Sequence, residues 1–348
     1  MTQQKNTKTR NVALSTSILT FTAFVWGMGF VAQRAGMESV GPFFFSGARM
    51  LLGALTLFFI IALTQVVGKI RSRRQLSGGV AGTPLPDAGE KTPQTKPDAP
   101  PAASRMRLIK AGALCGGILF FAGNFQQVGM VTTTASKSGF LTALYIVLVP
   151  ILGIILKRKT HWNTWVSVLI AAGGLYFLCV TNDMQIAPGD LIVLIGSLGW
   201  ATHVYAIDHF VREFNQSDVL KLCALQFLFA GAAAFICAPF FDGFFNPAPL
   251  TLAAVSDVLV SILYAGIAST GIGFTLQAVG QKYANPSEAA IIMSLESVFS
   301  VIGGMIILGE KMSGREILGC VLMFAAVILA QLPIGTKPEL AESSSAGQ

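Results

Sequence analysis

Charged residues are scarce in this chain. Asp, Glu, Lys and Arg make up 12% of its 348 residues, about half the share that is typical of soluble domains. Hydrophobic residues make up 53% of the chain, which includes 25 Phe, and the mean hydropathy is +0.65. This composition excludes an ordinary soluble domain and indicates a polytopic membrane protein.

The sequence motifs of common enzymes are also missing. The five cysteines lie in apolar segments without a Cys-x-x-Cys or Cys/His cluster, which excludes a disulfide framework and a zinc site. The chain has no His-Glu-x-x-His, no Gly-x-Ser-x-Gly and no pair of mid-membrane Asp residues. Glu310 stands where a phosphate-binding loop would need Lys. We therefore expect no enzyme activity, no cofactor and no metal site.

Ten apolar segments are long enough to cross a bilayer, which takes about 20 residues of helix. They are the segments 14–35, 43–67, 109–131, 135–156, 164–181, 190–211, 218–240, 257–280, 287–308 and 314–332. The first has basic residues before it, as a signal peptide does, but its apolar stretch is long and no Ala-x-Ala site follows. It is predicted to stay in the mature protein.

The distribution of Lys and Arg predicts the orientation, because cytoplasmic loops carry the excess of these residues. The formal net charge is +7, yet the basic residues lie between apolar segments and form no single patch, so no nucleic-acid partner is expected. With both termini inside, 19 basic residues fall on the cytoplasmic side and four on the other. The predicted location is the plasma membrane, the inner membrane of a bacterium, with cytoplasmic N- and C-termini.

Residues 68–107 interrupt the pattern of apolar segments. They contain six Pro, five Gly, eight basic and three acidic residues and almost no large apolar ones. Such a segment cannot bury a core, so it is predicted to be a disordered cytoplasmic insert. It is either a tether for anionic lipids or an insertion that a surface loop tolerates. Polar cytoplasmic tails are expected at 1–11 and 333–348.

The two halves of the chain resemble each other. At an offset of 151 residues, 120–180 align with 271–331 without a gap, with ten identities that include Gln126/Gln277 and Leu144/Leu295. Trp26 matches Trp200 at an offset of 174, and Arg49 faces Gln226 at an offset of 177. Because each half holds five predicted spans, an odd number, the second copy enters the membrane from the opposite side. The fold expected is all-α, with ten transmembrane helices in two inverted five-helix repeats, 12–180 and 189–332.

Several short motifs follow one another along these spans. They are Trp26-Gly27, Gly47-Ala48-Arg49-Met50, Gly189-Asp190 with Trp200 ten residues on, Ser294-Leu295-Glu296 and Leu308-Gly309-Glu310-Lys311. Their order is similar to that of the EamA family of the drug/metabolite transporter superfamily. The resemblance implies a cavity near the midplane, alternating access, and substrates such as amino acids, other small metabolites or drugs. Two positions depart from the family: Ser297 stands where Pro is frequent, and Tyr145-Ile146 where a Thr-Pro step is common.

Three of the ionisable residues inside the predicted spans are candidates for a site, because such groups are costly there and often functional. Glu296 is ten residues into its span, so its carboxyl group must face a wet cavity, pair with a base or be protonated. It and His203 are the candidates for proton coupling; a Glu bonded to helix ends and a neutral His bonded to a carbonyl group are the structural alternatives. Arg49 can bind a substrate carboxylate or form a structural pair.

Amides and aromatic residues supply the remaining candidates for lining the cavity. Asn124 and Gln126 lie in one span and Gln277 at the matching place in the other half, and helix–helix hydrogen bonding is the alternative role. Trp26, Tyr145 and Trp200 can stack on a ligand or simply pack. The full candidate set is Trp26, Arg49, Asn124, Gln126, Tyr145, Trp200, His203, Gln277 and Glu296.

A carrier that exports amino acids or related small amphiphilic metabolites is the function that these features favour. Its expected partners are a small-molecule substrate and the lipid bilayer. Proton exchange, exchange of one metabolite for another and passive facilitation all fit the candidate residues. A receptor or scaffold without transport is the main alternative, and an intramembrane enzyme is the other.

Overall fold

The computed structural model describes residues 2–77, 101–133, 135–158, 160–179, 187–246, 250–308 and 313–332. Within these ranges the regular structure is helical throughout, without a strand. The first half contains α1 (Thr2–Gly36), α2 (Pro42–Ser77), α3 (Pro101–Gly129), α4 (Ala135–Ala143), α5 (Tyr145–Ile155) and α6 (Trp162–Cys179). The second half contains α7 (Pro188–Glu213), α8 (Gln216–Phe245), α9 (Leu252–Asp257), α10 (Leu259–Leu263), the π-helix η1 (Tyr264–Gly273), α11 (Phe274–Gln281), α12 (Pro286–Met293), α13 (Glu296–Leu308) and α14 (Gly314–Gln331).

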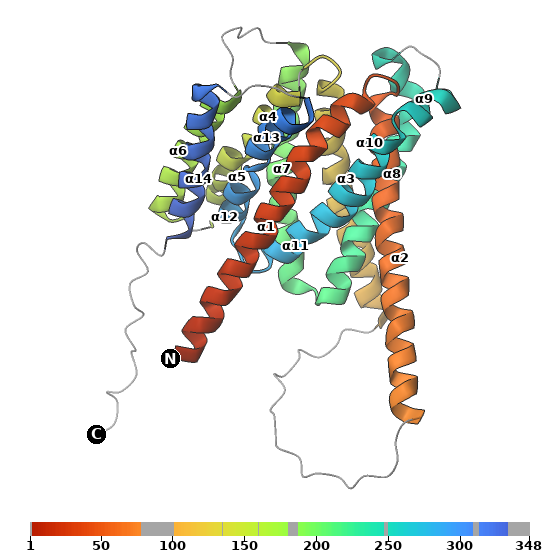
Figure 1. Ribbon diagram of the computed structural model, residues 1–348. Helices are drawn as coiled ribbons and strands as arrows, with labels where there is room; N and C mark the ends of the chain where they lie inside the picture. The colour runs from red at the N-terminus through yellow and green to blue at the C-terminus, as the bar shows by residue number, and fades with distance from the viewer. Residues whose placement is uncertain are drawn as a thin grey trace, which may run out of the picture.

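The described residues contain eight helices or joined helices that are long and apolar enough to span a membrane. They correspond to the predicted spans except 164–181 and 314–332, so the predicted count of ten is not confirmed. Those two segments form α6 and α14, which pack on each other at one edge of the bundle (Figure 1). The protein is therefore an all-helical, multi-pass membrane protein.

The prediction that residues 68–107 are disordered is wrong at both ends of that range. Helix α2 continues to Ser77, and α3 already begins at Pro101. The stretch 68–77 holds Lys, Arg, Gln and Leu, which favour a helix, and no Pro. Pro101 takes the first position of its helix, where the missing N–H costs nothing. Residues 78–100, like the predicted C-terminal tail 333–348, lie outside the described residues.

Two predicted spans are broken near their middle. The span 135–156 divides into α4 and α5 at Leu144, and the span 287–308 divides into α12 and α13 at Ser294 and Leu295. Leu144 and Leu295 occupy equivalent positions at the offset of 151, so the two halves break at the same place. No Pro occupies either break. The first residues after the breaks are Tyr145 and Glu296, which are again equivalent.

The helices of the two halves pack in reciprocal pairs. Helix α2 contacts α8, and α6 contacts α14. Helix α3 packs on α7, and the equivalent helices, α1 with η1 and α11, pack in the same way. Helix α1 contacts α13, whereas α7 contacts α4 and α5. Exchanging the two halves therefore reproduces this set of contacts.

Glycines allow the close approach of α3 and α8. A Cβ atom added to Gly112 would lie 2.6 Å from Cβ of Leu225, and one added to Gly116 would lie 2.8 Å from the carbonyl oxygen of Gln226. Gly112 and Gly116 are spaced as Gly-x-x-x-Gly, a pattern that lets two helices approach closely. By contrast, a Cβ added to the neighbouring Gly117 would meet no atom within 4 Å.

This difference predicts opposite outcomes for two adjacent substitutions. Gly116→Ala is expected to destabilise the protein by about 1–3 kcal/mol, because the added methyl group must push α8 away. Gly117→Ala is expected to keep or slightly raise the stability, because the added methyl group meets no atom within 4 Å and Ala favours a helix more than Gly does. Thermal unfolding of the purified proteins in detergent measures both, and equal midpoints for the two variants would contradict the packing described.

Candidate functional site

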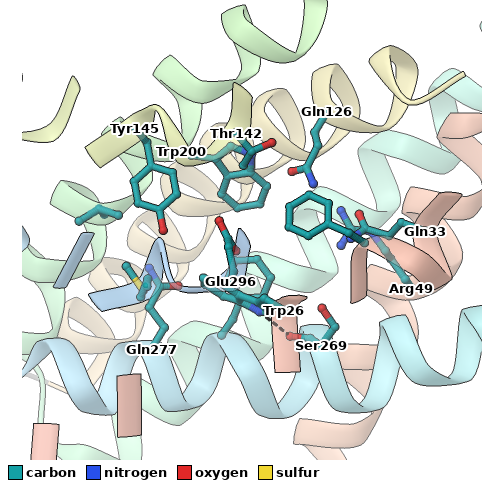
Figure 2. Close-up of a pocket in the computed structure, with 14 residues that line it drawn as sticks. Trp26, Gln33, Arg49, Gln126, Thr142, Tyr145, Trp200, Ser269, Gln277 and Glu296 are labelled. Carbon is teal, nitrogen blue, oxygen red and sulfur yellow. Dashed lines mark hydrogen bonds between the residues drawn. The ribbon is translucent and has the colours of Figure 1, made fainter. Parts of the chain in front are cut away.

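A pocket lies in the middle of the bundle, at the point where helices from both halves meet. Its lining comes from α1, α2, α3, α4, α5, α7, η1, α11, α12 and α13, and it consists of Trp26, Phe30, Gln33, Arg49, Gln126, Thr142, Tyr145, Trp200, Val204, Ser269, Phe274, Gln277, Met293 and Glu296. The cavity volume is about 40 Å³, which is room for a few water molecules. Figure 2 shows these side chains converging from separate helices.

Aromatic rings form one wall of the pocket. The Phe274 ring lies between two indoles, with its centroid 4.7 Å from that of Trp26 and 5.8 Å from that of Trp200. Trp26 is held in place because its Nε1 donates to the carbonyl oxygen of Ser269, at 3.1 Å (Figure 2). That carbonyl group belongs to the π-helix η1, a kind of helix often found at functional sites. The wall offers flat apolar surface to a ligand.

Arg49 and Glu296 bring a guanidinium and a carboxyl group to this pocket without forming an ion pair with each other among the described residues. Arg49 is 2% exposed and Glu296 is 3% exposed. Nε and Nη2 of Arg49 and Oε1 of Glu296 have no hydrogen-bond partner within the described part of the chain. In Figure 2 the Arg49 side chain lies beside Gln33 at one end of the pocket, and the Glu296 carboxyl group points into its middle. Because buried polar and ionisable groups normally have partners, these two groups are candidates for binding a ligand.

The backbone around each of these two residues is closely fitted. A Cβ atom on Gly27 of α1 would lie 2.5 Å from the carbonyl oxygen of Glu296, so glycine lets α1 and α13 touch where the carboxyl group enters the pocket. A Cβ atom on Gly123 of α3 would lie 3.3 Å from Nη2 of Arg49. Gly27 therefore allows the backbones of α1 and α13 to touch, and Gly123 leaves room for the Arg49 guanidinium group.

Further unpartnered polar atoms surround the two charges. Among the described residues, the side-chain oxygens of Gln33, Gln126, Gln277, Thr142 and Tyr145 are buried without a hydrogen-bond partner. Trp200 adds an unpartnered indole N–H group. Buried polar groups usually have partners, so this concentration at one place points to a binding site rather than to a packed core.

Seven of the nine residues predicted for the cavity line this pocket, and two do not. The seven are Trp26, Arg49, Gln126, Tyr145, Trp200, Gln277 and Glu296. Asn124 instead donates from its Nδ2 to the carbonyl oxygen of Phe120, at 2.8 Å within α3. His203 is buried behind the aromatic wall, with its Nε2 2.9 Å from Oε1 of Gln226 and its ring against Trp200 and Phe274.

Seven lining residues are not among those predicted from the sequence, and they are Phe30, Gln33, Thr142, Val204, Ser269, Phe274 and Met293. Two of them carried a usable signal, because Phe30 and Gln33 follow Trp26 by four and seven residues and share its helix face. Phe274 had no such signal. Its position follows from the wide turns of η1 directly before it.

Ten of the lining residues form pairs at equivalent positions of the two halves. The pairs are Gln126/Gln277, Thr142/Met293 and Tyr145/Glu296 at the offset of 151, and Trp26/Trp200 and Phe30/Val204 at the offset of 174. The shape of the pocket is thus nearly symmetric, whereas its charge is not. The residue equivalent to Glu296 in the first half is Tyr145. The residue equivalent to Arg49 in the second half is Gln226, which forms a hydrogen bond with His203. These replacements put a guanidinium group at one end of the pocket and a carboxyl group in its middle (Figure 2).

The part of the chain that the structure describes contains no group of three or more His, Cys, Asp or Glu residues able to hold a metal ion. The pocket lining offers a guanidinium group, a carboxyl group, amides, hydroxyl groups and aromatic rings.

Comparison with known proteins decides the family. The model of the EamA-like transporter family matches residues 16–180 and again residues 187–332. The chain belongs to the EamA-like transporter family. The two matches place one copy of the EamA unit in each half of the chain, and the pocket lies between the two copies.

Several relatives of this EamA protein are themselves named as transporters. An "Uncharacterized transporter" of Archaeoglobus fulgidus is 26% identical over 317 residues, 91% of this chain and 85% of the relative. YoaV of Bacillus subtilis, an "Uncharacterized transporter", is 22% identical over 88% of this chain and 92% of its own length. YedA of Escherichia coli, an "Uncharacterized inner membrane transporter", is 26% identical over 51% of this chain and 47% of its own.

A crystal structure of another protein shows the same fold. It matches with a TM-score of 0.64 at 16% identity, over 91% of this chain and 98% of the other. The family and the named relatives together identify this EamA protein as a membrane transporter.

Proposed function

We propose that this protein is a secondary carrier that exports small zwitterionic metabolites, such as amino acids, by alternating access. The observation that carries the proposal is that Arg49 and Glu296, which have opposite charges when both are ionised, lie in one central pocket with buried polar atoms that lack a hydrogen-bond partner in the described part of the chain. The Arg49 guanidinium would bind the carboxylate of the substrate in a bidentate manner. Glu296 would bind its ammonium group, and the aromatic wall would pack against an apolar side chain.

The reciprocal contacts and the matched helix breaks support an inverted repeat of five plus five spans. In this arrangement α6 and α14 are the two remaining spans, both termini are cytoplasmic, and the membrane is the plasma membrane. Because the present cavity volume is about 40 Å³, the lining helices must move apart to admit a metabolite. Two equivalent halves provide two equivalent ways of opening, one towards each side.

Proton coupling follows if substrate and proton use the same carboxyl group. The ionised Glu296 binds the ammonium group, and the protonated form does not. Substrate binding on one side would therefore release a proton, and a proton bound from the other side would release the substrate. The predicted result is exchange of an outgoing metabolite for an incoming proton. His203, bonded to Gln226 behind the pocket, is placed to orient the wall rather than to touch the substrate.

Thermal unfolding of the purified protein tests the substrate class. Amino acids are to be compared with their amides, which lack the carboxylate, and with the corresponding deaminated acids. Because a ligand that binds the folded state raises the unfolding midpoint by mass action, zwitterions should raise it more than either analogue. Equal shifts for all three would contradict the two-charge site, and no shift with any of them would favour a receptor or scaffold.

A further inference from the structure

A surface groove runs between α3 and α7, outside the central pocket. Its first part is lined by Arg107, Lys110, Leu114 and Phe210, among others, and has a volume of about 460 Å³. Its second part continues past Leu114 along Gly117, Phe121 and Leu198 and has a volume of about 450 Å³. Leu114 belongs to both parts, so the two form one continuous groove.

The groove extends from the edge of the membrane to its middle. Lys110 lies in the first turn of the predicted span 109–131, and Phe121 lies eleven residues further along the same helix. At 1.5 Å per residue this separation is about 17 Å, close to half of the hydrocarbon core of about 30 Å. The groove therefore has the length of one lipid leaflet.

The two ends of the groove differ in charge. At the end of the groove near the start of α3, Lys110 is exposed and forms no ion pair among the described residues. Arg107 pairs with Glu213, 2.5 Å away, and lies over the Phe214 ring with 60% of its side chain exposed. Deeper in the groove the lining is apolar, with Leu114 55% and Leu198 48% exposed.

A glycine keeps the deeper part open. No atom lies within 4 Å of the place that a Cβ atom of Gly117 would occupy. This contrasts with Gly112 and Gly116, five residues and one residue earlier, where atoms of α8 occupy the corresponding space. The open space at Gly117 therefore serves no contact between helices.

We propose that this groove binds one anionic phospholipid of the cytoplasmic leaflet. The phosphate group lies against Lys110 and the exposed side of Arg107, and one acyl chain follows Leu114, Gly117 and Leu198 towards the bilayer midplane. Basic pockets at this side of a membrane bind acidic lipid head groups. The assignment uses the cytoplasmic orientation of the start of α3 and is independent of the transported substrate.

Binding of phosphatidylglycerol and phosphatidylcholine with identical acyl chains, measured by native mass spectrometry of the full-length protein, tests the site. The wild type should bind phosphatidylglycerol more tightly. Lys110→Gln should weaken that binding about fivefold, the effect of one basic residue at a membrane surface. The matched control is Arg105→Gln, because Arg105 is an exposed basic residue of the same helix that does not line the groove. It should leave binding unchanged.

A second variant tests the acyl chain and distinguishes a lipid from a soluble anion. Gly117→Leu fills open space, so the fold should persist, as its unfolding midpoint will show. It should weaken binding of phosphatidylglycerol and leave that of soluble glycerol phosphate unaffected. Equal binding of the two lipids, equal effects of the Lys110 and Arg105 substitutions, or binding of phosphatidylglycerol that Gly117→Leu does not change would each overturn the proposal.

Discussion

Glu296→Gln is expected to weaken the binding of zwitterionic ligands about hundredfold, the effect of removing one member of a buried charge pair. The substitution keeps the size of the side chain and removes its charge, so the ammonium group loses its counter-ion in the middle of the pocket. Deaminated acids, which present only a carboxylate, should bind the variant and the wild type alike. Isothermal titration of both ligand types against both proteins measures the difference.

The same variant tests the proton coupling. In the wild type a rise in pH should strengthen substrate binding, because protons and substrate compete for one carboxyl group. Glu296→Gln should bind with no dependence on pH over the same range. Glu38→Gln is the control, since Glu38 is exposed and outside the pocket, and it should behave as the wild type does. A pH dependence that survives in Glu296→Gln would assign the coupling to another group.

Arg49→Gln is also expected to lower the affinity for zwitterions about hundredfold. In this variant the analogue that binds unchanged should be the amide and not the deaminated acid. The variant loses the bidentate partner of the substrate carboxylate, so amides of amino acids should bind it as they bind the wild type. Gln is also the residue that the second half carries at the equivalent position, Gln226. The substitution therefore makes that pair of positions alike and removes the positive end of the pocket.

Counterflow of a labelled amino acid into proteoliposomes provides the transport measurement. Uptake should fall to background in Arg49→Gln. Arg34→Gln, which removes the same charge from the last turn of α1 without touching the pocket, should retain transport. If Arg49→Gln transported normally, the guanidinium would have a structural role and the substrate would need no carboxylate. Because the amides test Arg49 and the deaminated acids test Glu296, this outcome would not by itself contradict the role proposed for Glu296.

Helix geometry explains which candidate residues reached the pocket. Asn124 and Gln126 are two positions apart, and successive residues of an α-helix are turned by about 100°. Both side chains therefore cannot face the same pocket, and Gln126 is the one that does. In the same way Phe30 and Gln33 belong to the face of α1 that Trp26 marks. This part of the site was within reach of the sequence, because it needs only the period of one helix.

Other features depend on contacts between segments that are distant in the chain. The breaks at Leu144 and at Ser294 and Leu295 contain no Pro, and the two broken spans meet where Ser297 donates to the carbonyl oxygen of Gly139, at 3.4 Å. The π-helix η1 likewise has its Ser269 carbonyl group bonded to Trp26, which lies 243 residues earlier. No local pattern of residues predicts such contacts.

The amino-acid sequence by itself determined that this is a multi-pass membrane protein of the EamA family, with two related halves and a few costly polar groups inside apolar segments. The membrane character is a local property, since hydropathy is read from runs of neighbouring residues, and the resemblance to the family rests on the order of short motifs along those runs. Only the tertiary structure decided that Arg49 and Glu296 share one pocket without pairing, that His203 stands behind its wall, and that the helices break at equivalent points. Those properties come from the packing of whole helices against one another, which brings together side chains that the sequence keeps far apart.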